Sequence, residues 1–376
     1  MPDTRMQNDE PTRDDQLGRS EFARALATIA TTSETPLVIG LYGRWGAGKT
    51  SLMRIVQSKL DADGETKTVW FDAWRHQFDE HPALGLMHTM VNELGIQESA
   101  KCALTTVARA LGSWALKATT SLDIGDIEGS LRKYEEQNFK IRDDRTRLYE
   151  SFEEIVRTAQ GTAESTEHRI VFFIDDLDRC LPAHILSVLE SLKLFLNIQG
   201  CVYFLGVDRH ALEGSIRQHY EDCELDEVSY LDKIIQLPFT IPPISEGAAR
   251  NFIQKLLPDE LSNCRPILEA GLGRNPRGIK RFIRTLQLNQ ALAKRIIPSH
   301  RPQVLAALLL IQYSKPELYS DIAGSPGLLY ELVSESDKSA QLCEEYLAGD
   351  ELLLEALRLV DLPDQEILRQ YIYLTS

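Results

Sequence analysis

The segment Gly43–Thr50 reads Gly-Arg-Trp-Gly-Ala-Gly-Lys-Thr and matches the phosphate-binding pattern G-x-x-x-x-G-K-[ST] in full. Its glycines let backbone N–H groups turn inward around phosphates, because a Cβ would obstruct the approach. Lys49 is expected to contact the β- and γ-phosphates, and the Thr50 hydroxyl to ligate Mg²⁺. The expected nucleotide-binding residues are Gly43, Arg44, Trp45, Gly46, Ala47, Gly48, Lys49, Thr50 and Ser51.

Two carboxylates at the end of a later apolar run indicate a metal and a catalytic acid. The run Val171–Ile174 leads directly into Asp175 and Asp176. Ligands of open α/β sheets bind at the carboxyl ends of the strands, which is where these side chains would lie. Asp175 is expected to hold Mg²⁺ through water, and Asp176 to polarise the attacking water. A strand end that is acidic only for solubility does not explain the complete phosphate loop upstream.

Two further candidates are predicted from weaker patterns. Asp208 follows the apolar run Cys201–Val207 and would lie near the γ-phosphate if that strand neighbours the one ending at Asp175. Arg277, in the basic segment 275–281, could stabilise transition-state charge on a γ-phosphate. An ordinary strand end and a solvated basic patch remain open as alternatives for these two residues.

The elements that must position these residues alternate between strand and helix. Short apolar runs bounded by turn residues predict strands over 36–42, 68–71, 169–174, 201–207 and 234–241. Helical periodicity appears between them, around 17–29, 52–60 and 185–195. Such alternation predicts an α/β fold with a mostly parallel sheet covered on both faces.

Domain boundaries follow from where the strands stop. Residues 1–16 are polar and predicted to be a mobile tail, and 17–243 a P-loop NTPase domain with a helical insertion at about 83–160. Beyond Pro242-Pro243 only helical patterns occur, so 244–376 is predicted to be an all-helical domain that acts as a lid or binds a partner.

Composition restricts the class of protein. The 376 residues are 43% hydrophobic and 26% charged, as in folded soluble chains, and the net charge of −15 argues against a nucleic-acid coat or a polybasic membrane anchor. The six cysteines include no C-x-x-C pair, which is typical of reduced thiols. The longest stretch without a charge is 14 residues, against about 20 for a membrane span. We expect a cytoplasmic protein without a membrane segment.

The base of the nucleotide is predicted by what the sequence lacks. No Asn/Thr-Lys-x-Asp box of the GTPases is present, so ATP is favoured over GTP. The glycine spacing is also not that of the dinucleotide-binding pattern G-x-G-x-x-G.

Taken together, these segments resemble the KAP P-loop NTPases, a family named in part after the plasmid phage-exclusion protein PifA. The similarity covers roughly residues 15–290 and includes the Gly-x-Trp-Gly-x-Gly-Lys-Thr-Ser form of the phosphate loop. The other segments that carry it are Asp15-x-Leu-Gly-Arg-x-x-Phe-Ala23, Phe71-Asp-Ala-Trp74, Ile174-Asp-Asp-Leu-Asp-Arg-Cys180, Val207-Asp-Arg209, Tyr230–Phe239 and Asn275-Pro-Arg-Gly-Ile-Lys-Arg281.

The resemblance implies an ASCE-type sheet, in which a catalytic strand is placed between the phosphate-loop strand and its neighbour, and a C-terminal helical lid. It implies ATP hydrolysis coupled to assembly or signalling, often in bacterial defence against phage. It also implies that 17–22 lies near the adenine and that Arg277 is a sensor or finger arginine. Many members insert transmembrane helices between the two motifs, whereas 102–122 carries Arg109 and Lys117 and is too polar to insert.

The leading hypothesis is therefore a Mg²⁺-dependent ATPase switch whose helical regions bind a protein partner or a second copy. A scaffold that binds ATP without turning it over is the main alternative. A small-molecule kinase would need a second substrate pocket, to which no feature of the sequence points. A nucleic-acid translocase is favoured only by the basic residues between Arg274 and Arg284, and the net charge opposes it.

Overall fold

The computed structural model describes residues 14–79, 82–96, 146–160, 168–195, 197–219 and 227–375. Its contacts divide the chain into two compact units. The first, called here the sheet unit, contains Arg19–Pro242 together with Asp15 and the residue before it. The second, the helical unit, begins at Pro243 and also takes in Gln16–Gly18.

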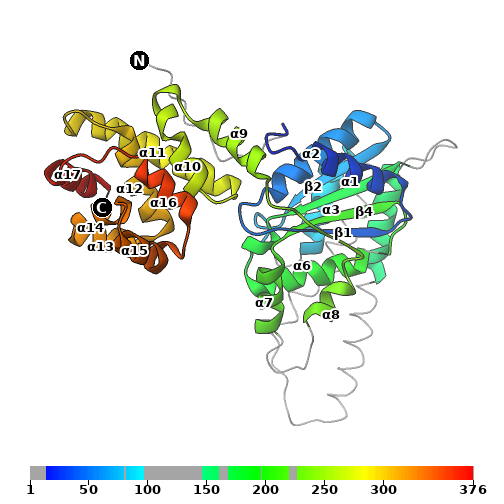
Figure 1. The fold of residues 1–376 in the computed structure, drawn as a ribbon. Coiled ribbons are helices and arrows are strands. Elements are labelled where there is room, and N and C mark those ends of the chain that lie inside the picture. Colours follow the sequence, from blue (N-terminus) through cyan, green and yellow to red (C-terminus); the bar gives the residue numbers. More distant parts are fainter. Residues whose placement is uncertain are drawn as a thin grey trace, which may run out of the picture. The chain divides into compact units, whose positions relative to one another are not determined.

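The sheet unit is built on five parallel strands in the order β2-β3-β4-β1-β5 (Figure 1). The strands are β1 (Leu37–Tyr42), β2 (Thr66–Asp72), β3 (Arg169–Asp175), β4 (Cys201–Val207) and β5 (Leu237–Thr240). Strand β4 lies between β1, which precedes the phosphate loop, and β3, which ends at Asp175. This is the inserted strand of the ASCE arrangement, and it confirms the predicted fold class.

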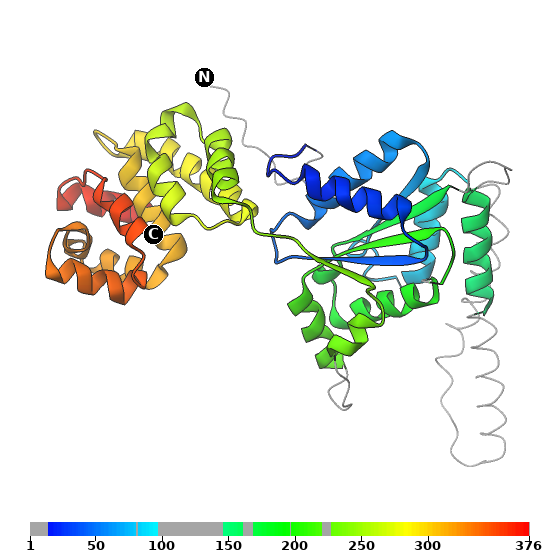
Figure 2. The ribbon, with the colours of Figure 1, turned by 45° about the vertical axis from the view of Figure 1, so that its right-hand side comes forward.

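Helices cover both faces of the sheet (Figures 1 and 2). They are α1 (Ser20–Thr32), α2 (Lys49–Asp63), α3 (Pro82–Glu93), α6 (Pro182–Phe195), α7 (Arg209–His219) and α8 (Glu227–Asp232), with helical residues also at 146–160. The face under α1 and α2 buries Phe173 and Phe204, whose rings stack at 5.1 Å. The opposite face buries Phe172 and Tyr203, stacked at 4.9 Å. Alternate side chains of β3 and β4 therefore fill two separate cores, as strand periodicity requires.

All five predicted strands are present, but β5 is shorter than the predicted 234–241. The amides of Ile234 and Ile235 donate to the Leu231 carbonyl oxygen, at 2.9 and 2.8 Å. These two residues therefore form the turn that ends α8, and only Leu237–Thr240 pairs with β1. Both isoleucines are still buried, which explains why their apolar pattern resembles a strand.

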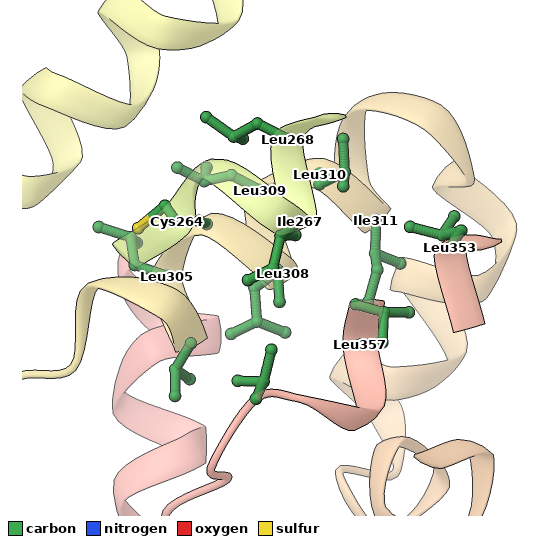
Figure 3. Packing of buried hydrophobic residues seen from close by; sticks show 14 of the residues in the cluster. Cys264, Ile267, Leu268, Leu305, Leu308, Leu309, Leu310, Ile311, Leu353 and Leu357 are labelled. Atoms are coloured by element: carbon green, nitrogen blue, oxygen red, sulfur yellow. The ribbon is translucent and has the colours of Figure 1, made fainter. Parts of the chain in front are cut away.

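The helical unit has no strand among its described residues, as predicted. Its helices are α9 (Glu246–Leu256), α10 (Arg265–Gly271), α11 (Pro276–Ile296), α12 (Pro302–Ser314), α13 (Pro316–Gly324), α14 (Gly327–Val333), α15 (Asp337–Leu347), α16 (Glu351–Arg358) and α17 (Gln365–Thr375). Every residue of Val304–Ile311 in α12 is buried, so this helix is surrounded on all sides. Figure 3 shows Leu308 and its neighbours in this core.

One glycine allows α12 and α16 to approach α10 closely. A Cβ on Gly271 of α10 would lie 2.3 Å from Leu310 Cδ2 and 2.9 Å from Leu353 Cδ1 of α16. Those distances are below van der Waals contact, so any side chain at this position would force both leucines to move. The packing of α10 against α12 and α16 thus depends on the absence of a side chain.

Most of the predicted insertion at 83–160 lies outside the described residues, including the segment 102–122. Its two described ends, α3 and residues 146–160, are helical as predicted. Among the residues that the structure describes, no helix is long and apolar enough to cross a membrane.

Candidate functional site

The phosphate loop connects the end of β1 to the start of α2. The Gly43 amide donates to the Val207 carbonyl oxygen at 3.2 Å, which holds the first residue of the loop against β4. Gly46 and Gly48 have φ of 80° and 89°, a region that favours glycine. Helix α2 begins at Lys49, directly after this turn, so its first amides face the loop and can bind an anion. The two left-handed glycines and the helix start are the local features that the sequence pattern predicts for this loop.

Lys49 is buried and paired within the site. Its Nζ donates to the Gly43 carbonyl oxygen at 2.9 Å and forms an ion pair with Asp178 Oδ2, also at 2.9 Å. The side chains of Lys49 and Asp178 are 9% and 5% exposed, so this ion pair is shielded from solvent. Asp178 is absent from the sequence-based candidates, yet it is the acid that contacts the phosphate-loop lysine. Phosphate oxygens entering the loop would compete with it for the ammonium group.

Asp175 combines deep burial with an unsatisfied oxygen. It is 3% exposed, accepts a hydrogen bond from Thr50, and its Oδ1 has no hydrogen-bond partner. Burial, followed by repulsion from Asp176, raises the pKa of Asp175 to about 7. A hydroxyl and a carboxylate are the hard oxygen ligands that Mg²⁺ prefers, so Thr50 and Asp175 fit the predicted metal.

No group of three or more metal-ligating His, Cys, Asp or Glu side chains occurs in the described part of the chain. A magnesium ion in a nucleotide site usually takes one or two protein oxygens and completes its shell with phosphates and water. The sequence places the two protein oxygens 125 positions apart, at Thr50 and Asp175, and the fold brings them into contact.

Asp176 is held in an unusual backbone conformation. Its φ of 56° lies in the left-handed region, which costs a non-glycine residue free energy and is frequent at functional sites. Its Oδ1 pairs with Arg179 Nε at 2.8 Å, and the Arg179 guanidinium lies 4.9 Å from the centre of the Trp45 ring. Burial, the largest cause, raises the pKa of Asp176, while Arg179 lowers it. Asp176 is therefore connected through Arg179 to the phosphate loop.

Strand β2 places a fourth carboxylate, Asp72, at the sheet edge where Asp175, Asp176 and Asp178 lie. Asp72 is the last residue of β2 and is paired in register with Asp175. The Ala73 amide donates to the Asp175 carbonyl oxygen at 3.0 Å, and Asp72 Oδ2 contacts Arg75 Nε at 3.0 Å. The rule that carboxyl ends of parallel strands meet at one edge would have identified Asp72 from the sequence. We refer to the four residues Asp72, Asp175, Asp176 and Asp178 as the acidic edge.

Asp208 follows a strand that neighbours β3, as its prediction assumed, and it also has a local role. It follows β4, the strand between β1 and β3. Its Oδ1 accepts a hydrogen bond from the His210 amide at 3.1 Å, which caps the first turn of α7. Capping accounts for an aspartate at this position without any catalytic role, so the orientation of water by Asp208 stays a prediction.

Arg277 lies in the helical unit, at the second residue of α11. The Asn275 side chain accepts hydrogen bonds from the amides of Arg277 and Gly278, and Pro276 occupies the first helical position. Asn-Pro is therefore a helix-start signal here. Arg277 therefore belongs to a different unit from the phosphate loop, and its contact with a phosphate stays a prediction.

Comparisons with known proteins show which family this chain resembles. Residues 19–293 match the KAP family P-loop domain. The chain is 24% identical over 245 residues to the Phage T7 exclusion protein of Escherichia coli (strain K12), a match that covers 59% of this chain and 32% of that protein. This chain thus aligns with about a third of the length of that relative.

Solved structures resemble the chain only weakly. The ORC2 protein of Aeropyrum pernix, solved in ADPNP and ADP complexes, has a TM-score of 0.42 and 14% identity, covering 95% of this chain and 94% of its own. The Walker-type ATPase paby2304 of Pyrococcus abyssi has a TM-score of 0.40 and 13% identity, covering 97% and 99%.

Proposed function

Because the chain belongs to the KAP family of P-loop domains, we propose that it is a Mg²⁺-dependent ATPase that works as a molecular switch. The observation that carries the proposal is the junction of the phosphate loop with the acidic edge. There Lys49 pairs with Asp178, and Thr50 contacts an Asp175 carboxylate that has one unsatisfied oxygen. This junction supplies cationic, hydroxyl and carboxylate groups at one strand edge, as phosphoryl transfer requires.

Nucleotide binding would proceed by an exchange of partners at Lys49. The loop amides and the start of α2 would surround the phosphates, and the Lys49 ammonium would turn from Asp178 to the β- and γ-phosphate oxygens. Thr50 and Asp175 would hold Mg²⁺, which when bound neutralises charge on the phosphates. Release of Asp178 from Lys49 would then report that the loop is occupied.

Hydrolysis would use Asp176 to orient the attacking water and accept its proton. A general base works best when its pKa approaches the operating pH, and burial moves the pKa of Asp176 in that direction. Arg179 would fix the direction of the Asp176 carboxylate through the 2.8 Å ion pair. Asp208 would assist in orienting the water, and Arg277 would stabilise negative charge on the γ-phosphate.

The helical unit would serve as a lid or as a surface for a protein partner or a second copy. The similarity to a phage-exclusion protein supports, but only loosely, a role in defence against phage. A scaffold that binds ATP without turnover is the alternative. The location of Arg277 favours this scaffold alternative. Arg277 is the only arginine proposed to stabilise the transition state, and it belongs to the helical unit, whereas the phosphate loop belongs to the sheet unit.

The test is steady-state ATP hydrolysis with Mg²⁺ at several protein concentrations, comparing the wild type with Asp176→Asn. We expect the variant to bind ATP normally and to lose turnover about 100-fold or more, as when a general base is removed. Asp361→Asn is the matched control, because its side chain is 86% exposed in the helical unit. Unchanged turnover in Asp176→Asn would exclude Asp176 as the base, and binding without turnover at every concentration would favour the scaffold.

A further inference from the structure

Arg19 is a buried cation whose hydrogen-bond acceptors are main-chain carbonyl groups. It is 5% exposed, and its Nη1 donates to the Ala47 carbonyl oxygen at 2.6 Å while Nη2 donates to the Pro242 carbonyl oxygen at 3.2 Å. Its own amide donates to Asp15 Oδ1 at 2.8 Å. Burial lowers the pKa of Arg19, and the nearby Asp15 opposes that effect. Asp15, predicted to belong to a mobile tail, instead caps the helix that begins beside Arg19.

The first of these bonds acts on the phosphate loop itself. Ala47 and Gly48 share one peptide unit, in which the C=O and N–H groups point in opposite directions because a trans peptide is planar. A guanidinium that holds the Ala47 carbonyl away from the loop therefore directs the Gly48 N–H toward the loop interior. Gly48, with φ of 89°, is the last residue before α2, so this amide belongs to the set that would surround a phosphate.

The second bond connects the loop to the point where the chain leaves the sheet unit. Pro242 is the last residue of the sheet unit, and Pro243 begins the helical unit. Arg19 itself directly follows Gln16–Gly18, which belong to the helical unit. One guanidinium thus links the phosphate loop to two places at which the chain passes between the units.

We propose that Arg19 is a positioning residue of the phosphate site, which fixes the Ala47–Gly48 peptide for phosphate binding and transmits occupancy of the loop to the segment at Pro242. This inference rests on the proposed function. It differs from the role implied by the family resemblance, in which 17–22 lies near the adenine. A residue that shapes the loop affects every nucleotide, whereas a residue that contacts the base affects the choice between bases.

The test is Arg19→Lys, which keeps the positive charge but removes the two-pronged geometry of the guanidinium. We expect its dissociation constants for ATP and for GTP, each with Mg²⁺, to rise by the same factor of about ten, as for the loss of one charge-assisted hydrogen bond. Turnover at saturating ATP should fall less than the affinity, so that KM rises more than kcat drops. Arg24→Lys, on the exposed face of α1, is the matched control and should leave both constants unchanged.

Three outcomes would overturn the positioning role. The first is an Arg19→Lys variant that binds ATP as tightly as the wild type. The second is a loss confined to ATP, which would assign Arg19 to base recognition. The third is a drop in kcat without a change in affinity. A wild type that binds no nucleotide would instead refute the proposed function, and that measurement precedes the variant.

Transmission to Pro242 is tested by amide hydrogen exchange on the wild-type chain, which does not depend on a variant folding. ATP should slow exchange in the phosphate loop and also at Ile241 and Ile244, which flank the two prolines. In Arg19→Lys at saturating ATP, the loop should still respond while Ile241 and Ile244 should not. No response at these two amides in the wild type, or an equal response in the variant, would refute the transmission.

Discussion

The acidic edge of the sheet unit and the core of the helical unit bury polar groups in opposite ways. In the helical unit, buried Gln290 contacts His300, buried Ser339 donates to the Leu332 carbonyl oxygen, and buried Thr375 contacts Tyr319. At the acidic edge, Asp175 is just as buried, yet its Oδ1 has no partner. Satisfied polar groups stabilise a fold, whereas an unsatisfied buried carboxylate costs free energy unless a ligand completes it. The proposed function accounts for this difference, because a bound metal would supply the partner that Asp175 Oδ1 lacks.

The largest effect should follow from Lys49→Ala. We expect nucleotide affinity to fall by about 100-fold or more, because charge-assisted contacts to the phosphates are lost. The free energy of unfolding should fall by about 3–5 kcal/mol, since Asp178 is left as a buried unpaired charge. Denaturant unfolding and nucleotide titration measure the two quantities separately.

The double variant Lys49→Ala/Asp178→Asn is the control for that prediction. It should recover much of the lost stability, because position 178 no longer carries an unpaired charge, while nucleotide binding stays impaired. A double variant that binds nucleotide like the wild type would contradict the assignment of Lys49 to the phosphates.

Leu308→Ala should weaken only the helical unit. Leu308 is fully buried on α12 among other leucines (Figure 3), and removing its side chain should cost about 2–5 kcal/mol of unfolding free energy. Because the phosphate loop lies in the sheet unit, nucleotide affinity of the folded protein should not change. The matched control is Leu359→Ala, whose side chain is 76% exposed and should shift stability by less than about 0.5 kcal/mol. Loss of nucleotide affinity in Leu308→Ala would show that the two units do not act separately.

Asp175→Asn should stabilise the protein without nucleotide. The pKa of Asp175 is about 7 in the folded state and 3.8 without the fold. The folded state favours the protonated carboxyl of Asp175. Its contribution to the free energy of unfolding is therefore fully present below about pH 4 and is lost as pH rises through 7. At pH 8 the variant should gain about 2 kcal/mol over the wild type, an order-of-magnitude value for relief of a buried charge.

The same variant should lose the Mg²⁺ dependence of nucleotide binding. Unfolding followed from pH 4 to pH 8 gives the stability, and titrations with and without Mg²⁺ give the second readout. If the difference in unfolding free energy between wild type and variant stays constant from pH 4 to pH 8, Asp175 does not titrate in that range.

The smallest effect on stability should come from Asp208→Asn. Asparagine caps helices about as well as aspartate, so the capping of α7 and the free energy of unfolding should change by less than about 0.5 kcal/mol. Loss of ATP turnover in this stable variant would assign Asp208 to catalysis, and unchanged turnover would leave it as a helix cap.

The sequence by itself determined the features that depend on residues close together in the chain. The Gly43–Thr50 pattern specifies a strand, a glycine turn and a helix start in succession, and the apolar run before Asp175 specifies a buried strand with acids at its end. Each follows from backbone geometry over fewer than ten residues. The parallel sheet and the all-helical C-terminal part follow from the order of such local patterns.

Only the tertiary structure decided which of these groups meet. Lys49 pairs with Asp178, 129 positions away, and not with any of the three acids chosen from the sequence. Asp72 lies beside Asp175 through the register of β2 with β3, and Arg19 contacts Pro242 across 223 positions. Contacts over such distances depend on strand order and on side-chain packing, which no local spacing encodes. For the same reason, the burial that raises the pKa of Asp175 is a property of the folded sheet edge and not of the motif.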